Sequence, residues 1–366
     1  MKKIVFSVTN DLNYDQRMIR ICSSLSAAGY KILLVGRART QSTTLDTRPY
    51  EQKRLNCWFQ KGKVFYIEYN IRLFFFLLFT KMDCICAIDL DTILPCYFIS
   101  VIKKTKRVYD AHELFCEMKE IVTRPFIYKT WKCIERLAVP KFQHGYTVNQ
   151  PIADEFKKLY NVNYSIIRNV PILHPSDNMQ KTAAVEQRFL LYQGDVNEGR
   201  SFETLIPAMK KVPLPLIVYG DGNFFEQAKQ LVKQNNLEDK VIFKGRIKPE
   251  ELRSITPKAY LGITFFENNG LSNYLSLANK FFDYIHAGVP QLCVGYPAYK
   301  EINNQFEVAH LIDDLSAENI ATQLNFLLDN NVLYNRLRQN CLEARKVLNW
   351  QTEEKELITF YKKLLG

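Results

Sequence analysis

SLANKFFDYIHAGVP, residues 276–290, is the stretch that decides the fold, because it predicts one short helix whose N-terminus faces an anion. Ser276 is suited to cap the first turn, Gly288 to end the helix in a left-handed conformation, and Pro290 to prevent its continuation. The first-turn amides have no partners within the helix and lie at the positive end of its dipole. A diphosphate is a natural ligand there.

Lys280 and Asp283 extend this prediction along the helix. Lys280 adds a full positive charge near the N-terminus, and the carboxylate of Asp283 can accept hydrogen bonds from the two hydroxyls of a ribose. The alternative is an amphipathic core helix, with Phe281, Phe282 and Ile285 inward and a surface Lys–Asp pair. For a single helix this alternative is the commoner one, so the choice between an anion-binding helix and a core helix depends on the rest of the chain.

Two runs of alternating strands and helices surround this helix. Apolar runs typical of buried parallel strands occur at 3–8, 31–36, 84–88, 107–111 and 145–149, and then at 189–194, 216–220, 241–245, 261–266 and 291–295. A polar, proline-bearing segment over 168–187 separates the two runs. The sequence therefore predicts an α/β chain of two doubly wound, Rossmann-like domains that face a central cleft.

Charge is unevenly distributed along the 366 residues. Residues 1–170 hold 27 Lys and Arg against 15 Asp and Glu, whereas the remainder is nearly neutral. The basic cluster 103–107 and the aromatic stretch 70–82 together resemble a surface that binds acidic lipid. A solvated helix end explains the cluster equally well, and nucleic acid ranks third because no nucleic-acid-binding motif accompanies the charge.

Cysteines and apolar runs bear on the location of the protein. Nine cysteines are scattered without CxxC spacing or nearby histidines, which favours reduced thiols in the cytoplasm. The N-terminal apolar run predicts a buried strand and not a signal peptide, and 73–79 is far too short to span a bilayer. We expect a cytoplasmic protein, with the cytoplasmic face of a membrane as the second location.

Four ordered segments of the second half resemble a known family. They are LLYQGDVNEGRSFETLIPA (190–208), LIVYGDGNFFEQAKQLV (216–232), DKVIFKGRIKPEEL (239–252) and LANKFFDYIHAGVP (277–290). They look like the donor half of the family 4 (group 1) glycosyltransferases of GT-B fold. Segments 10–36, 108–114 and 145–156 resemble the acceptor domain of that family, and 349–365 resembles its closing helix.

This resemblance implies a domain division and a reaction. It implies an N-terminal Rossmann-like acceptor domain over 1–170, a linker over 171–187, a nucleotide-sugar donor domain over 188–348, and a helix over 349–366 that packs back toward the N-terminal domain. The reaction is retaining transfer of a sugar from a nucleotide diphosphate sugar, UDP-sugar ahead of GDP-sugar, to a saccharide or lipid-linked glycan in polysaccharide or glycan biosynthesis. Neither a metal nor another cofactor is implied, and the remaining partner is an anionic membrane, not nucleic acid.

Site residues follow from the resemblance position by position. His112 matches a histidine that faces the reacting sugar, and Arg200 matches a phosphate-binding lysine, so the catalytic candidates are His112, Arg200 and Lys280. The donor-binding candidates are Gly194, Arg200, Gly220, Gly222, Arg246, Ser276, Asn279, Lys280 and Asp283. The acceptor-binding candidates are Asp11, Asn13, Asp15, Arg17 and Glu113, and Arg17 is alternatively a helix-surface charge.

Two positions depart from the family pattern. Leu275 stands where the family has the first glutamate of a pair, so a contact to the donor sugar has to come from elsewhere, with Asn273 or Asn279 as candidates. Asp195 stands where the family has an arginine, which leaves Arg200 with more of the phosphate charge. Donor choice therefore stays open.

Three rival interpretations remain. Asp89 and Asp91 form a DxD pair like that of metal-dependent GT-A transferases, although we expect Asp91 to cap the helix that follows. A nucleotide-sugar epimerase would share the fold but lack an acceptor. A nucleotide-sugar-binding subunit without catalysis would be consistent with Leu275.

Overall fold

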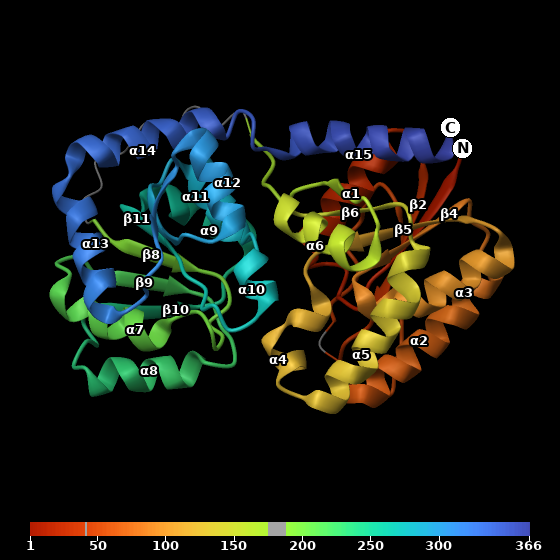
Figure 1. The fold of residues 1–366 in the computed structure, drawn as a ribbon, viewed down its shortest axis with the longest axis horizontal. Coiled ribbons are helices and arrows are strands. Elements are labelled where there is room, and N and C mark those ends of the chain that lie inside the picture. Colours follow the sequence, from red (N-terminus) through yellow and green to blue (C-terminus); the bar gives the residue numbers. More distant parts are fainter. Residues whose placement is uncertain (41, 175–187) are drawn as a thin grey trace. The chain divides into compact units, whose positions relative to one another are not determined.

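The chain divides into two compact units in a computed structural model that describes residues 1–40, 42–174 and 188–366 (Figure 1). The first unit comprises Met1–Asn169 and Thr352–Gly366, and the second comprises Val170–Gln351. Most of the expected linker, 171–187, lies outside the described residues. Each unit contains one parallel sheet with interleaved helices, which confirms the prediction of two Rossmann-like domains; the cleft between them stays a prediction.

Seven parallel strands form the sheet of the first unit, in the order β3-β2-β1-β4-β5-β6-β7. They are β1 (Lys3–Ser7), β2 (Lys31–Arg37), β3 (Glu51–Leu55), β4 (Cys84–Ile88), β5 (Lys106–Ala111), β6 (Gly145–Thr147) and β7 (Ser165–Ile166). The strand order reverses direction between β1 and β4, so the sheet is doubly wound. Ligands bind at the carboxyl ends of strands in such sheets.

Helices cover both faces of this sheet. They are α1 (Gln16–Ala27), α2 (Gly62–Phe79), α3 (Ile93–Lys103), α4 (Lys119–Val122), α5 (Pro125–Ala138), α6 (Gln150–Tyr160) and α15 (Trp350–Leu365). Figure 1 shows α1 and α15 over one face and α2, α3 and α5 over the other. Helix α6 lies beside α5, because the hydroxyl of Tyr160 donates a hydrogen bond to Glu135. Coverage of both faces explains why the central strands are continuous apolar runs, as in CICAI of β4, where every residue is buried.

Six parallel strands form the sheet of the second unit, in the order β10-β9-β8-β11-β12-β13. They are β8 (Leu190–Gln193), β9 (Leu216–Tyr219), β10 (Val241–Gly245), β11 (Leu261–Thr264), β12 (Gln291–Val294) and β13 (Ala309–Ile312). The strand order again reverses at the first strand, between β8 and β11. The candidate donor residues therefore follow strands that end at one edge of this sheet.

Eight helices connect or follow these strands in the described part of the second unit. They are α7 (Phe202–Ala208), α8 (Phe225–Gln234), α9 (Pro249–Ile255), α10 (Leu271–Leu275), α11 (Asn279–Ala287), α12 (Pro297–Phe306), α13 (Ala317–Asp329) and α14 (Asn331–Ala344). No helix among the described residues of the whole chain is long and apolar enough to cross a membrane.

Helix α15 belongs to the first unit from Thr352 onward, although it follows the second unit in the chain. Tyr361 is fully buried, and its ring packs edge-on against Phe6 and Tyr146, with centroids 6.1 and 6.4 Å away. Glu353 accepts hydrogen bonds from the backbone N and the guanidinium of Arg168. Aromatic packing and this ion pair join α15 to the sheet.

We expect Tyr361→Ala to lower the free energy of unfolding of the first unit by about 3–5 kcal/mol, because it leaves a cavity among aromatic rings. Tyr361→Phe is the control: it removes only a hydroxyl, which lies 3.4 Å from that of Tyr146, and should cost less than about 1.5 kcal/mol. Urea denaturation measures both. An alanine variant within about 1 kcal/mol of the wild type would show that α15 is not held by this packing.

Candidate functional site

The helix expected over residues 276–290 begins later than predicted. Ser276 ends the short helix α10 instead of capping α11, because its hydroxyl donates a hydrogen bond to the carbonyl of Asn273 at 2.8 Å. Helix α11 begins at Asn279, and its N-cap, Ala278, has no side-chain cap. Gly288 ends the helix with a φ of 66°, as predicted. The unpaired first-turn amides therefore belong to residues from Asn279 on.

Lys280 is a buried cation at this helix start. Its ammonium lies 3.5 Å from the centroid of the Tyr192 ring and has no hydrogen-bond partner among the described residues. Burial, together with the positive charge of Arg200, lowers the pKa of Lys280 well below its usual value. A buried ammonium without an acceptor is costly, and an anionic ligand would supply the missing counter-charge.

Arg200 adds a second cation beside Lys280. It lies in the segment between β8 and α7, and its guanidinium stacks over the Phe266 ring at 4.2 Å. The Lys280 ammonium lies 5.8 Å from the centroid of the same ring. Arg200 Nη1 also donates to Asn273 Oδ1 at 3.4 Å, so Asn273 orients the guanidinium. Two cations thus meet at one aromatic ring near the carboxyl edge of the sheet.

Three glycines let the strand-end segments approach each other. Gly194, with a φ of 112°, lies against Lys280, since a Cβ there would be 3.5 Å from Lys280 Cε. A Cβ at Gly220 would overlap the carbonyl oxygen of Gly194, and one at Gly222 would overlap the carbonyl oxygen of Val196. The segments after β8 and β9 therefore pack backbone against backbone, which only glycine permits.

Asp283 is oriented by the end of strand β8. Gln193 Nε2 donates to Asp283 Oδ2 at 2.9 Å, and Gln193 Oε1 accepts a hydrogen bond from Thr256 at 2.9 Å. Because both partners of the glutamine amide are fixed, the carboxylate is held one turn beyond Lys280. This position agrees with the expected role as a ribose ligand, which stays a prediction.

Of the other donor-side residues, Arg246 lies at the surface and Leu275 lies in the core. Arg246 is 71% exposed and pairs with Asp195 at 3.6 Å, so the acidic residue at the family's arginine position has its own cation. Leu275 is buried. Among the described contacts of Asn273, the amide nitrogen donates to Asn269 and the oxygen faces Arg200.

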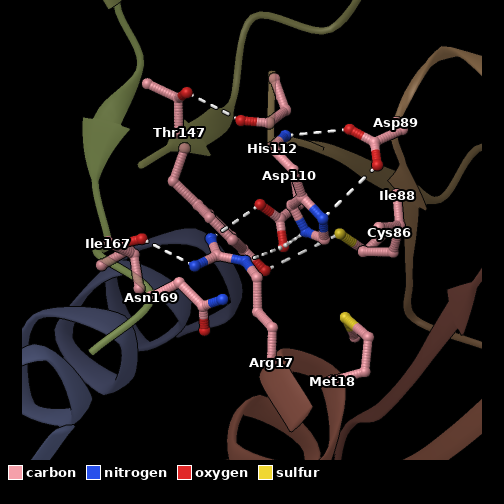
Figure 2. Close-up of polar contacts among 12 residues, drawn as sticks. Arg17, Met18, Cys86, Ile88, Asp89, Asp110, His112, Thr147, Ile167 and Asn169 are labelled. Atoms are coloured by element: carbon pink, nitrogen blue, oxygen red, sulfur yellow. Dashed lines mark hydrogen bonds and ion pairs between the residues drawn. The ribbon is translucent and has the colours of Figure 1, made fainter. Parts of the chain in front are cut away.

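His112 is the centre of a charged cluster at the end of β5 (Figure 2). Its Nε2 lies 3.1 Å from Asp110 Oδ2, and its Nδ1 lies 3.4 Å from Asp89 Oδ2. Burial opposes the charged form, but the two carboxylates prevail and raise the pKa of His112 to about 9. The imidazole is therefore a cation at neutral pH.

Arg17 lies behind this cluster and not on the helix surface, so the surface-charge interpretation is wrong. Its side chain is 3% exposed and donates to both carboxylate oxygens of Asp110, with Nη2 at 2.8 Å from Oδ1 and Nε at 3.3 Å from Oδ2. Nη1 donates to the carbonyl of Ile167. Burial closes Arg17 to an acceptor, and its guanidinium positions Asp110, which in turn holds His112.

The loop after β1 uses its polar side chains internally. Asp11 is buried and accepts hydrogen bonds from Ser42, from the backbone of Asn13 and from Arg54. Burial opposes ionisation, but these hydrogen bonds and the charge of Arg54 lower the pKa of Asp11. The carboxylate thus ties the loop to strand β3, and its role as an acceptor ligand stays a prediction.

Neighbouring acceptor candidates have structural partners as well. Asn13 Nδ2 donates to the carbonyl of Thr44 at 2.8 Å, and Asp15 caps α1 by accepting from the backbone N of Met18 at 3.1 Å. Glu113 directly follows His112 and is partly exposed. Of the expected acceptor residues, the structure places Arg17 and Glu113 at the His112 cluster.

The DxD pair is used inside the first unit. Asp89 has a φ of 55° and accepts a hydrogen bond from the backbone N of His112 at 2.9 Å, so a strained backbone is held at the cluster. Asp91 does not cap α3, because it lies within a 3-10 turn and accepts from Thr9. Burial and the charge of Asp89 raise the pKa of Asp91 to about 7. The described residues contain no group of three or more His, Cys, Asp or Glu placed to hold a metal.

Four residues of these sites were not predicted from the sequence. Tyr192 and Phe266 flank the two cations, Gln193 orients Asp283, and Asp110 holds His112. Gln193 and Asp110 share a signal that could have identified them: each is a polar residue that directly follows apolar residues at the buried end of its strand. Aromatic residues at strand ends carry no comparable signal.

Solved structures with the same architecture define the fold of the chain. Sucrose-phosphate synthase from Thermosynechococcus elongatus has 16% identity and a TM-score of 0.81, with 100% of this chain and 99% of that chain covered. WaaG, a glycosyltransferase involved in lipopolysaccharide biosynthesis, has 14% identity, coverage of 97% and 98%, and a TM-score of 0.75. Anabaena HepE, in complex with UDP and glucose, has 14% identity, coverage of 99% and 100%, and a TM-score of 0.74. The chain has the GT-B fold.

The family model described as "Glycosyl transferases group 1" matches residues 176–344. The match falls on the second unit of the chain, where the motifs that resemble this family lie. No curated protein matches the sequence.

We expect the stabilisation by His112 to be lost as pH rises. Its pKa of about 9 in the folded protein exceeds the usual 6.5, so its contribution is full below pH 6.5 and disappears as pH rises through 9. The difference in unfolding free energy between wild type and His112→Gln, from urea denaturation at several pH values, should shrink over this window. Asp89→Asn should lower the pKa of His112 in an NMR titration. A pH-independent difference would contradict the cationic imidazole.

Proposed function

We propose that this protein is a retaining, metal-independent glycosyltransferase that uses a nucleotide diphosphate sugar, with UDP-sugar ahead of GDP-sugar. One observation carries the proposal: Lys280 is a buried basic side chain with no acceptor among the described residues, beside Arg200 and at the start of α11. A diphosphate would place its negative charge against both cations and the first-turn amides. Two of the solved structures of similar fold, Anabaena HepE and Staphylococcus aureus TarM, are complexes that contain UDP.

The proposed donor site has one residue for each part of the nucleotide diphosphate. Arg200 and Lys280 bind the phosphates, Asp283 accepts hydrogen bonds from the ribose hydroxyls, and Gly194 lets the diphosphate approach the backbone. Because Gln193 already orients Asp283, the ribose ligand costs little further ordering on binding. The base and the sugar are proposed from the family pattern alone, and Leu275 leaves the choice of sugar open.

In the proposed reaction, the bond between the anomeric carbon and the phosphate oxygen breaks and the acceptor hydroxyl bonds to that carbon on the same face. The acceptor proton passes to the departing phosphate, whose growing charge is stabilised by Arg200 and Lys280. No protein nucleophile is required. His112 is assigned to the donor sugar by its sequence motif. Because both ring nitrogens face carboxylates, its proposed contribution there is its positive charge.

The acceptor is proposed to be a saccharide or a lipid-linked glycan, in polysaccharide or glycan biosynthesis on the cytoplasmic side of the cell. TarM, in complex with saccharides, and WaaG, from lipopolysaccharide biosynthesis, support this class of acceptor. An epimerase and a non-catalytic nucleotide-sugar-binding subunit remain the alternative functions.

Incubation of the purified protein with labelled UDP- and GDP-sugars, each with saccharides or with lipid-linked glycans from membranes, tests the proposal. We expect transfer from a UDP-sugar, with the anomeric configuration of the donor kept in the product by NMR. Conversion of the donor sugar without an acceptor would indicate an epimerase. Donor binding without transfer to any acceptor would indicate a binding subunit; a thermal shift detects that binding, since ligand at a hundred times its Kd stabilises by about 2.7 kcal/mol.

We expect Arg200→Ala and Lys280→Ala to lower kcat by about 10²-fold or more, because each removes a cation from the departing diphosphate. Lys280→Met separates this effect from folding: it fills the space beside Tyr192 without a buried charge, so it should unfold no more easily than wild type yet lose similar activity. Lys229→Ala, at an exposed position on α8, is the matched control. A loss below tenfold in either alanine variant would refute the role of that cation.

A further inference from the structure

The outward face of helix α2 is apolar along its length. At helical spacing, its exposed side chains are Val64, Ile67, Ile71, Phe75 and Phe79. Its opposite face supplies the buried residues Phe65, Tyr69, Leu73 and Leu77. A helix on the surface of a protein ordinarily turns polar residues to water, so an apolar outward face indicates that something covers it.

Helix α3 continues this apolar face. Phe98, Val101 and Ile102 are exposed on it, and α2 and α3 pack side by side (Figure 1). The ends of the two helices meet where Lys103 Nζ donates to the carbonyl of Thr80 at 2.9 Å. We call the exposed residues between 61 and 107 the α2–α3 surface.

Composition distinguishes this surface from an ordinary one. It has fourteen exposed residues, of which eight are the apolar side chains named above, five are lysines and the last is Gly62. The lysines are Lys61, Lys63, Lys81, Lys104 and Lys106. The four acidic residues in this range are all buried or partly buried, so none is among the exposed residues. The surface is therefore apolar and exclusively basic.

A basic pocket adjoins the apolar face at the end of α3. Its volume is about 400 Å³, and Val101 lines it together with Lys104, Lys106, Arg107, Lys141 and His144. None of the described residues that line the pocket carries a carboxylate. Burial and the charge of Lys106 lower the pKa of His144, which is consistent with a positive field there. Val101 belongs to both features, so the pocket and the apolar face are continuous.

We propose that the α2–α3 surface docks on an anionic lipid bilayer. The apolar side chains enter the boundary between headgroups and acyl chains, the lysines bind anionic headgroups, and the pocket holds the phosphate of one lipid. An apolar face can bind a bilayer or a second copy of the chain, and the charge of the surface distinguishes these two partners. A second copy of the chain in a two-fold dimer would bring this exclusively basic surface against itself, whereas an anionic bilayer is complementary to it.

Two contributions set the expected strength of binding. Burial of the aromatic and aliphatic side chains favours binding to any bilayer, and each lysine near an anionic surface strengthens it by about fivefold. Binding should therefore require anionic lipid and weaken as salt screens the charges. The proposal does not depend on glycosyl transfer, because the docking surface lies on α2 and α3 and includes no residue of the proposed donor site.

Flotation of the full chain with vesicles tests the proposal, with pure phosphatidylcholine compared with phosphatidylcholine that contains 30% phosphatidylglycerol, at low and high salt. Ile71→Glu/Phe75→Glu removes apolar contacts, and Lys104→Glu/Lys106→Glu reverses charges at the pocket. Their controls lie in the second unit at exposed positions: Val332→Glu, and Lys229→Glu/Lys233→Glu on α8. UDP binding by each variant shows whether the donor site is intact.

We expect wild type to bind the anionic vesicles, both test variants to bind at least tenfold more weakly, and both controls to bind as wild type. Binding that is equal on neutral vesicles, absent from anionic ones, or unchanged in the test variants would overturn the proposal. A wild type that is dimeric in solution, and that Ile71→Glu/Phe75→Glu makes monomeric, would identify a second copy as the occupant. Absence of UDP binding in the wild type as well as in every variant would count against the proposed function and not against membrane docking.

Discussion

Parallel strands that are buried on both faces leave only their carboxyl ends for polar side chains, and the rest of this structure depends on that constraint. Strand β5 ends next to His112, and strand β8 ends at Gln193, which holds Asp283. In both units the polar side chains emerge where the apolar run stops. The helices that cover the faces supply their partners, as α1 supplies Arg17 and α11 supplies Lys280.

The ends of β5 and β8 differ in whether their charges are balanced by other residues of the protein. At the end of β5, the charges balance within the protein: Arg17 and His112 share Asp110, and Asp89 approaches the other ring nitrogen of His112. At the end of β8, the Lys280 ammonium faces an aromatic ring, and no residue within 1–40, 42–174 or 188–366 supplies an acceptor for it. The first cluster is thus organised without a ligand, whereas the second needs an anion to complete it.

Sequence patterns predicted the central strands and missed most edge strands. Continuous apolar runs identify strands that are covered on both faces, such as β1 and β4, whereas β3 (EQKRL) and β13 (AHLI) lie at sheet edges and carry polar residues. Motif position correctly placed Lys280 beside Arg200, but not the start of α11. A serine that bonds its own preceding turn looks the same in sequence as a serine that caps the next one, so Ser276 was misassigned.

The position of α15 has a consequence for how the protein is made. The first unit consists of residues up to Asn169 together with those from Thr352 on. The ribosome therefore synthesises the whole second unit between these two segments of the first. Until α15 leaves the ribosome, Phe6 and Tyr146 lack their contacts with Tyr361 and present aromatic surface to solvent. The second unit can therefore fold before the first unit is complete. Until α15 is synthesised, the incomplete first unit exposes apolar surface that chaperones can bind.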